Sequence, residues 1–220
     1  MPDIRRNIEK IRATLPSGVT LIAVSKYHPI EAIAEAYSAG QRHFGESKAQ
    51  DLRLKHQALP QDIKWHFIGH LQSNKIKYIA SFVHLIHSVD TLRLLQEINR
   101  HAANADRIIP CLLQIHIAQE DTKFGFTPDE CRAMLDEGTW RTLKNIQIRG
   151  LMCMASNTDN CTQIREEFEV VKALFDEIKQ KHFGNDDSFD TFSAGMSDDY
   201  TIAIEAGSTH IRIGSDIFAQ

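Results

Sequence analysis

The sequence has few cysteines, and none of them forms a pair at a metal-binding spacing. Its 220 residues include four, and no Cys-x-x-Cys motif occurs; the four are Cys111, Cys131, Cys153 and Cys161. They lie in apolar or helical stretches, so we expect reduced and mostly buried thiols. We therefore do not expect a fold held together by disulfide bonds.

An excess of positive charge, a long apolar run and a secretory signal are also missing. The chain carries 25 Lys and Arg against 29 Asp and Glu, a net charge of -4, which is unlike a polycationic nucleic-acid binder. Apolar runs such as residues 21–24 are far too short to span a membrane. No apolar segment follows the basic residues 5–6, as a signal peptide would require. We expect a cytoplasmic protein that binds neither nucleic acid nor membranes.

What the sequence does contain is a regular alternation of predicted strands and helices. Ile4, Ile8, Ile11 and Leu15 share one helical face, which predicts an N-terminal helix over about residues 3–15. Eight short apolar runs follow, with helical patterns between them. The predicted strands are 19–24, 43–45, 64–68, 82–88, 111–117, 148–154, 189–193 and 209–213. The predicted helices between them include 29–40, 46–59, 72–80, one capped by Asp90, 127–138, 160–182, and one capped by Ser197 that ends at Gly207.

This order favours an α/β protein of the (β/α)8 TIM-barrel type, formed as a single domain over residues 1–220. Strands joined through helices pair in parallel by right-handed crossovers, and eight such units close a barrel. An open doubly wound sheet is the alternative, but residues 25–29 follow the first strand without its glycine-rich dinucleotide turn. After the last strand, residues 216–220 form a short tail with no room for a full helix, so the N-terminal helix is expected to fill the gap in the outer ring.

Lys26 directly follows the first predicted strand, and in a barrel the functional groups lie at such strand ends. Alternation places Lys26 on the same side as Ile22 and Val24, facing the barrel interior. Burial there would lower the pKa of its amine from about 10.4 toward about 7–8 and make it a Schiff-base nucleophile. The alternative is a lysine that reaches solvent just beyond the strand.

The loops after the last two strands are candidates for a phosphate site, since TIM barrels often bind phosphate there. Ser197 opens the predicted helix after strand seven, where free backbone N–H groups suit an anion. Gly214 and Ser215 end strand eight and allow a ligand to approach the backbone. Ordinary helix capping by Ser197, with Asp198 and Asp199 in the first turn, is the alternative and is compatible with a phosphate site.

Arg212 is expected to be buried within strand eight, where it needs an acceptor. A structural salt bridge with Glu46 or another acid would satisfy it. The pairs His66/His70 and His84/His87 do not match a zinc-protease motif, and eleven histidines produce such pairs by chance. We expect no metal site.

Six segments together resemble the pyridoxal 5′-phosphate (PLP) homeostasis protein family, the YggS/PROSC type. They occur in the family's order and span positions 23–215, and they are highly specific only in combination. The segments are residues 23–26, 44–46, 66–75, 149–152, 195–199 and 212–215. Ser47 is a departure, since the family usually has Asn at this position.

The resemblance implies a barrel like that of the alanine racemase N-terminal domain, with PLP held as a Schiff base on Lys26. It also implies that Ser197, Gly214 and Ser215 bind the phosphate and that Arg212 faces the pyridine nitrogen. Asn74, in the matching segment after strand three, and Lys123, in the loop after strand five, complete the predicted cofactor site. The alternative for Lys123 is a loop lysine that is simply solvated.

The implied function is a PLP carrier and buffer without turnover. We expect a monomer whose partners are PLP and apo forms of PLP-dependent enzymes. A PLP-dependent racemase is one alternative, but such enzymes take a second base from a tyrosine on an extra domain. A lysine Schiff-base aldolase is another, and it would need an acid/base pair beside Lys26 that the sequence does not reveal.

Overall fold

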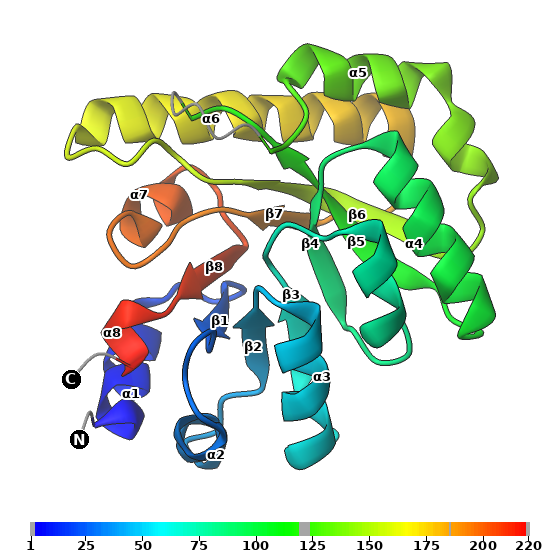
Figure 1. Cartoon of the computed structure of the whole chain (residues 1–220). Helices are drawn as coiled ribbons and strands as arrows, with labels where there is room; N and C mark the ends of the chain where they lie inside the picture. Colours follow the sequence, from blue (N-terminus) through cyan, green and yellow to red (C-terminus); the bar gives the residue numbers. More distant parts are fainter. Residues whose placement is uncertain (1–2, 119–123, 185, 219–220) are drawn as a thin grey trace.

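The computed structural model describes residues 3–118, 124–184 and 186–218 and contains a closed barrel of eight parallel strands (Figure 1). Each strand pairs with the next one in sequence, and β8 returns to pair with β1. The strands are β1 Thr20–Val24, β2 His43–Glu46, β3 Lys64–Phe67, β4 Leu85–Val89, β5 Ile109–Ile115, β6 Ile146–Cys153, β7 Thr191–Ser193 and β8 His210–Ile213. The predicted barrel is confirmed.

Helices surround the strands, and the main apolar core lies between these two layers. Phe44, Trp65, Phe168 and Phe189 are among its fully buried side chains. The helices are α1 Ile4–Thr14, α2 Ile30–Ser38, α3 Ala49–Ala58, α4 Leu92–Asn104, α5 Pro128–Glu137, α6 Cys161–Ile178, α7 Tyr200–Glu205 and α8 Ser215–Phe218. Two 3-10 helices, η1 Ser73–Tyr78 and η2 Thr139–Thr142, and a π-helical turn, η3 Lys179–Phe183, complete the set. Within the described ranges, no helix has the length and apolar character needed to cross a membrane.

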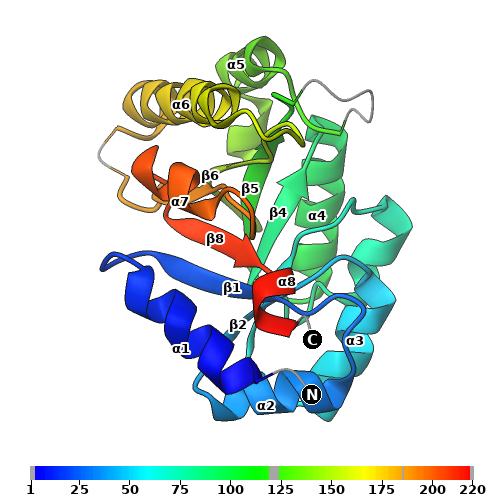
Figure 2. The same ribbon diagram turned by 90° about the vertical axis from the view of Figure 1, so that its left-hand side faces the viewer.

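Helix α1 fills the gap in the outer ring, as predicted, together with the short helix α8 (Figure 2). The Asp3 carboxylate accepts a hydrogen bond from the Arg6 N–H at 3.0 Å and caps α1, whose buried face includes Ile8. The Asn7 side chain donates to the Ile217 carbonyl at 3.1 Å. The first and last described helices therefore lie side by side.

Two helix starts differ from the prediction. Thr91, not Asp90, caps α4, and its hydroxyl accepts from the Leu94 N–H at 3.2 Å. After strand β7, the Asp199 carboxylate accepts from the Met196 N–H at 2.6 Å and closes a turn. Helix α7 therefore begins only at Tyr200, and Ser197 is not its cap.

Other local predictions were closer to the structure. The Thr127 capping box is formed with Glu130 as predicted, and Gly138 ends α5 in the left-handed conformation. The predicted α-helix over residues 72–80 is the 3-10 helix η1 instead.

Gly69, just after β3, lies very close to the backbone after β2. A Cβ atom there would be 2.7 Å from the Ser47 Cα and 2.8 Å from the Ser47 Cβ, closer than real atoms approach. The position where this chain has Ser47 therefore packs directly against Gly69.

Candidate functional site

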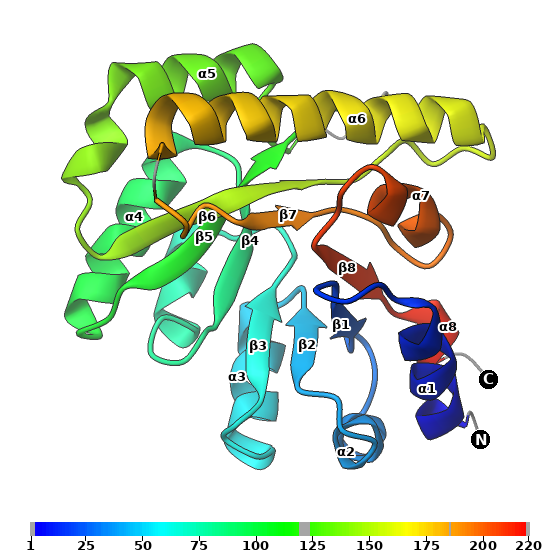
Figure 3. The same cartoon turned by 180° about the vertical axis from the view of Figure 1, so that it is seen from behind.

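The loops that follow β7, β8 and β1 meet at the C-terminal end of the barrel because these three strands are neighbours (Figure 3). Gly214, directly after β8, packs against the end of β1. A Cβ atom on Gly214 would lie 3.2 Å from the Val24 carbonyl oxygen and 3.3 Å from the Val24 Cβ. The Gly214–Ser215 turn is thereby brought beside the segment that carries Lys26.

Lys26 is exposed, so of the two alternatives left open by the sequence the structure shows the lysine that reaches solvent. Strand β1 ends at Val24, and the chain turns through Tyr27, which has a positive φ of 69°. The Lys26 Nζ lies 6.0 Å from the centroid of the Tyr27 ring, and the Lys48 Nζ lies 5.5 Å from the same centroid. The argument from desolvation therefore fails in this structure, and a nucleophilic role for Lys26 rests on the resemblance and on position.

The residue before Lys26 is anchored by a buried ionic network. The Lys55 Nζ donates to the Glu46 Oε1 at 2.6 Å and to the Ser25 carbonyl at 2.9 Å, and the Ser25 hydroxyl donates to the same carboxylate at 2.6 Å. Glu46 is thus paired with Lys55. The salt bridge between Glu46 and Arg212 that the sequence allowed is not formed. Sequence analysis missed Lys55, although it lies on the buried face of α3 with Ala49 and Leu52.

Arg212 is buried, as predicted, with 4% of its surface exposed. Its Nη1 donates to the Ser193 Oγ at 2.6 Å, and its Nη2 donates to the Cys153 carbonyl at 2.9 Å. Within the described ranges it forms no ion pair with a carboxylate. Burial lowers the pKa of Arg212, and nearby Cys153 and Asp199 oppose that shift. The guanidinium has five N–H donors and uses two in these bonds, so it retains capacity to donate to a ligand.

A file of hydrogen-bonded side chains leads from Arg212 down the barrel. The Ser193 Oγ is 2.9 Å from the His87 Nδ1, the His87 Nε2 is 2.8 Å from the His66 Nδ1, and the His66 Nε2 is 2.9 Å from the His43 Nδ1. His66 and His87 are fully buried, whereas His43 is partly exposed at the N-terminal end of β2. The file therefore connects the two ends of the barrel.

The histidines of the N-terminal end are uncharged at neutral pH. Burial, followed by the charge of Lys64, lowers the pKa values of His43 and His84 to about 4. Burial also lowers the pKa of His210 to about 4 and holds those of His66 and His87 well below 6.5. The pairs His66/His70 and His84/His87, interpreted above as chance pairs, do not describe the cluster, since His66 contacts His43, His84 and His87 across strands. Its inward position in the alternating strand β3 was the available signal.

Ser197, Gly214 and Ser215 offer backbone N–H groups at the C-terminal end. Within the described part of the chain, none of these three N–H groups donates a hydrogen bond. Asp198 is exposed, while the buried Asp199 is held in its own turn, and burial raises its pKa. Free N–H groups on two neighbouring loops can bind an anion.

A cavity of about 380 Å³ opens at the ends of β5 and β6, where it is lined in part by Gln114 and Met154, and it reaches the loop after β7 at Met196. Asn74 is exposed on η1, and no contact joins it to the cluster of Lys26, Ser197 and Arg212 among the described residues. Lys123 lies outside the described residues. The structure therefore brings together the predicted site residues that follow β1, β7 and β8. It does not place Asn74 with them, and it does not describe Lys123.

Comparison with known proteins identifies relatives over the whole chain. The family profile of the alanine racemase N-terminal domain matches residues 1–220. The pyridoxal phosphate homeostasis protein of Helicobacter pylori (strain J99) is 38% identical over 204 residues, which are 92% of this chain and 88% of that protein. The protein of the same name from Synechocystis is 39% identical over 213 residues, with 96% and 95% covered.

A solved structure supports the same relationship. PipY of Synechococcus elongatus PCC7942, determined with PLP bound, superposes with a TM-score of 0.90 at 35% identity. The match covers 99% of this chain and 100% of PipY.

Proposed function

Because this chain belongs to the alanine racemase N-terminal domain family and, within it, to the pyridoxal phosphate homeostasis proteins, we propose that it binds PLP at the C-terminal end of its barrel and takes part in PLP homeostasis. The observation that carries this proposal is Arg212, a buried guanidinium with unused donors and no carboxylate partner among the described residues. Such a charge is costly to bury unless a ligand or a polar neighbour compensates it.

The groups at this end fit the cofactor. PLP has a phosphate, a pyridine nitrogen and an aldehyde, and the described residues offer free backbone N–H groups, a buried guanidinium and an exposed amine. When bound, PLP supplies an aldehyde that combines with amines and a ring that accepts electrons.

Each residue has a distinct proposed role. Ser197, Gly214 and Ser215 bind the phosphate through backbone and hydroxyl hydrogens. Lys26, whose exposed side chain extends from the end of β1, attaches covalently to the cofactor as a Schiff base. Asn74 and Lys123 stay predictions from the resemblance.

Arg212 determines what the bound cofactor is suited to do. Arginine is a donor only and keeps its proton, so a ring nitrogen facing it stays unprotonated. An unprotonated ring withdraws electrons weakly, which suits the storage and delivery of PLP better than turnover of amino acids. We therefore propose a cytoplasmic, monomeric PLP carrier over residues 1–220 that supplies apo enzymes. No observation in the structure specifically favours the racemase alternative.

The test compares two exposed lysines that lie on the same tyrosine. Lys26→Ala should abolish the visible absorption of bound PLP and the adduct that borohydride fixes, because Lys26 is the lysine proposed to form the Schiff base. Lys48→Ala is the matched control and should keep both signals, since its Nζ lies over the same Tyr27 ring. An unchanged adduct in Lys26→Ala would refute the assignment.

A further inference from the structure

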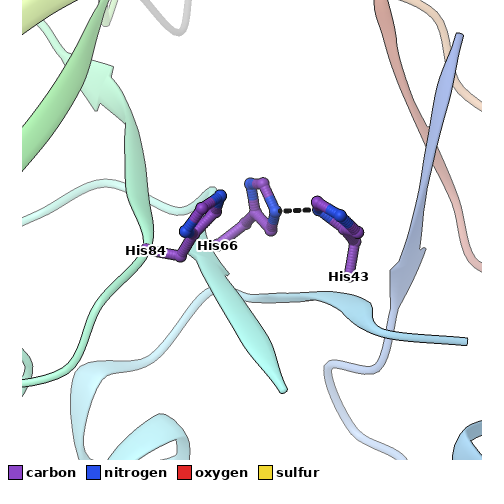
Figure 4. A group of neighbouring side chains, drawn as sticks. All are labelled: His43, His66 and His84. Atoms are coloured by element: carbon purple, nitrogen blue, oxygen red, sulfur yellow. Dashed lines mark hydrogen bonds between the residues drawn. The ribbon is translucent and has the colours of Figure 1, made fainter. Parts of the chain in front are cut away.

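Three histidine rings from neighbouring segments converge at the N-terminal end of the barrel (Figure 4). His43 begins β2, His66 lies in β3, and His84 immediately precedes β4. One ring nitrogen of each lies within 4.8 Å of the corresponding nitrogens of the other two. We propose that His43, His66 and His84 bind a divalent transition-metal ion of the Zn²⁺ type, at the end of the barrel opposite Lys26.

The kind of metal follows from the ligand atoms. The cluster offers imidazole nitrogens and no carboxylate or thiolate. Imidazole suits zinc, copper and nickel, whereas magnesium and calcium require oxygen ligands. Three histidines leave a fourth tetrahedral position for water, as in other three-histidine zinc sites.

The metal-free geometry is close to the one that binding requires. Zn–N bonds of about 2.0–2.1 Å place tetrahedral ligand atoms about 3.3 Å apart. The His43 Nδ1 and the His66 Nε2 are now 2.9 Å apart and share a hydrogen bond, which a metal would replace. The remaining pairs lie within 4.8 Å, so the rings need to approach by no more than about 1.5 Å. His84 is partly exposed, so its ring can make this adjustment.

The innermost ligand is already oriented by a second group. The His66 Nδ1 lies 2.8 Å from the His87 Nε2, and the His87 Nδ1 lies 2.9 Å from the Ser193 Oγ. If the His66 hydrogen is on Nδ1, the lone pair on Nε2 points at the cluster. Metal-binding histidines are usually held in this way through their other nitrogen.

Access and charge set opposing limits on affinity. His43 and His84 are partly exposed, so an ion can reach them from solvent before it contacts the buried His66. The Lys64 ammonium is exposed and close enough to influence both outer rings, and it repels a cation. Arg149 also faces His84, but it is neutralised by Asp190 at 2.6 Å. Reversing the charge at Lys64 should therefore strengthen binding.

The experiment uses Zn²⁺ as the probe and the untagged full-length chain. All variants carry Cys161→Ser, because Cys161 is an exposed free thiol that could bind zinc on its own. Competition with a chromophoric chelator should give one equivalent of bound Zn²⁺. His43→Ala and His84→Ala should each weaken binding by more than the roughly 10–100-fold that loss of an outer-shell partner costs. Lys64→Glu should strengthen it.

The matched control is His70→Ala. His70 is an exposed histidine paired with Asp90 at 3.2 Å, and it should bind no metal, so its removal should leave affinity unchanged. Absence of stoichiometric Zn²⁺ binding, or equal losses in His70→Ala and His84→Ala, would overturn the proposal.

A spectroscopic measurement covers the case in which an alanine variant fails to fold. Co²⁺ in the parent protein should give the strong visible bands of a tetrahedral nitrogen site, and Lys64→Glu should reach saturation at lower Co²⁺ concentration. Weak bands of an octahedral ion, or no response to Lys64→Glu, would also overturn the proposal.

Discussion

The two ends of this barrel are both polar, but they use opposite kinds of polar group. The C-terminal end presents a buried cation, Arg212, together with exposed amines and unpaired backbone N–H groups. The N-terminal end presents uncharged rings, His43, His66 and His84, that retain lone pairs. One end is built to donate hydrogen bonds to an anion, and the other can donate electron pairs to a cation.

The difference shows how burial selects the protonation state of each end. Arginine keeps its proton even where burial lowers its pKa, so it remains a donor. Histidine loses its proton under the same burial and becomes a neutral ring. The file from Arg212 through Ser193 and His87 to His66 joins these two kinds of site inside one core.

The largest expected effect is acid destabilisation that originates at the histidine end. The pKa values of His43, His84 and His210 are about 4 in the folded chain and about 6.5 when unfolded. Below pH 6.5 the unfolded state binds more protons, so stability falls as pH drops from 6.5 to about 4. For His210 a shift of this size corresponds to a loss of about 3 kcal/mol in the free energy of unfolding; solvent screening makes the loss smaller at His43 and His84, and coupled rings do not add fully.

Chemical denaturation between pH 7 and 4, with a chelator present, measures this loss. Burial is the largest cause of each lowered pKa; the charges of Lys64, Arg107, Arg149 and Arg212 lower it further, and Asp190 opposes the shift at His210. His84→Gln should flatten the pH dependence, while His70→Gln, at the exposed pair with Asp90, should not. Equal slopes in the two variants would contradict the assignment.

The next effect tests whether Arg212 serves the ligand or only the fold. Arg212→Met keeps an unbranched side chain of about the length of the arginine stem and removes all donors. PLP affinity should fall roughly 10–150-fold, because a hydrogen bond from a charged donor contributes about 1.5–3 kcal/mol. Stability should change by less than about 2 kcal/mol, since relief of a buried charge opposes the loss of bonds to Ser193 and Cys153.

Equilibrium PLP titration and denaturation separate these two quantities. His43→Gln, at the other end of the file, is the control and should leave PLP affinity unchanged. A large loss of stability in Arg212→Met with unaltered PLP affinity would mean that Arg212 only supports the barrel.

The smallest effect concerns the hydroxyl groups at the C-terminal loops. Ser197→Ala or Ser215→Ala should weaken PLP binding about 2–10-fold, because each loses one hydroxyl bond while the backbone N–H groups remain. Ser38→Ala is a suitable control, since its hydroxyl bonds to the Ala34 carbonyl on helix α2. Wild-type PLP affinity in both loop variants would place the phosphate elsewhere.

The sequence predicted the barrel because its signals are local. The strand runs, the Asp3 cap and the Thr127 capping box each depend on residues a few positions apart, and all appear in the structure. Helix starts were predicted wrongly where a side chain accepts a hydrogen bond from a different backbone N–H than expected. The Asp199 carboxylate accepts from the Met196 N–H, and α7 therefore begins at Tyr200.

The candidate site was predictable only in part for the same reason. Lys26 and the Gly214–Ser215 turn follow from the rule for strand ends and from the resemblance. The bond between His87 and Ser193 joins residues 106 positions apart, and the salt bridge of Glu46 with Lys55 joins a strand to a helix. The His87–Ser193 pair exists only after distant strands meet in the barrel, so no local pattern predicts it, whereas the position of Lys55 on the buried face of α3 was a local signal. The exposure of Lys26 likewise depends on where β1 ends.

Pairing of β8 with β1 also has a consequence for how this chain is made. Ala23 pairs with Ile213, and α1 packs against α8. The first strand can therefore complete its pairing only after the last strand has been synthesised. At about 5–20 residues per second, the roughly 190 residues between these partners take about 10–40 s to synthesise. During that time the edge of β1 that will pair with β8 has no partner in the nascent sheet. Slower translation of the middle of the gene should therefore lengthen the period in which this edge is open to chaperones and to aggregation.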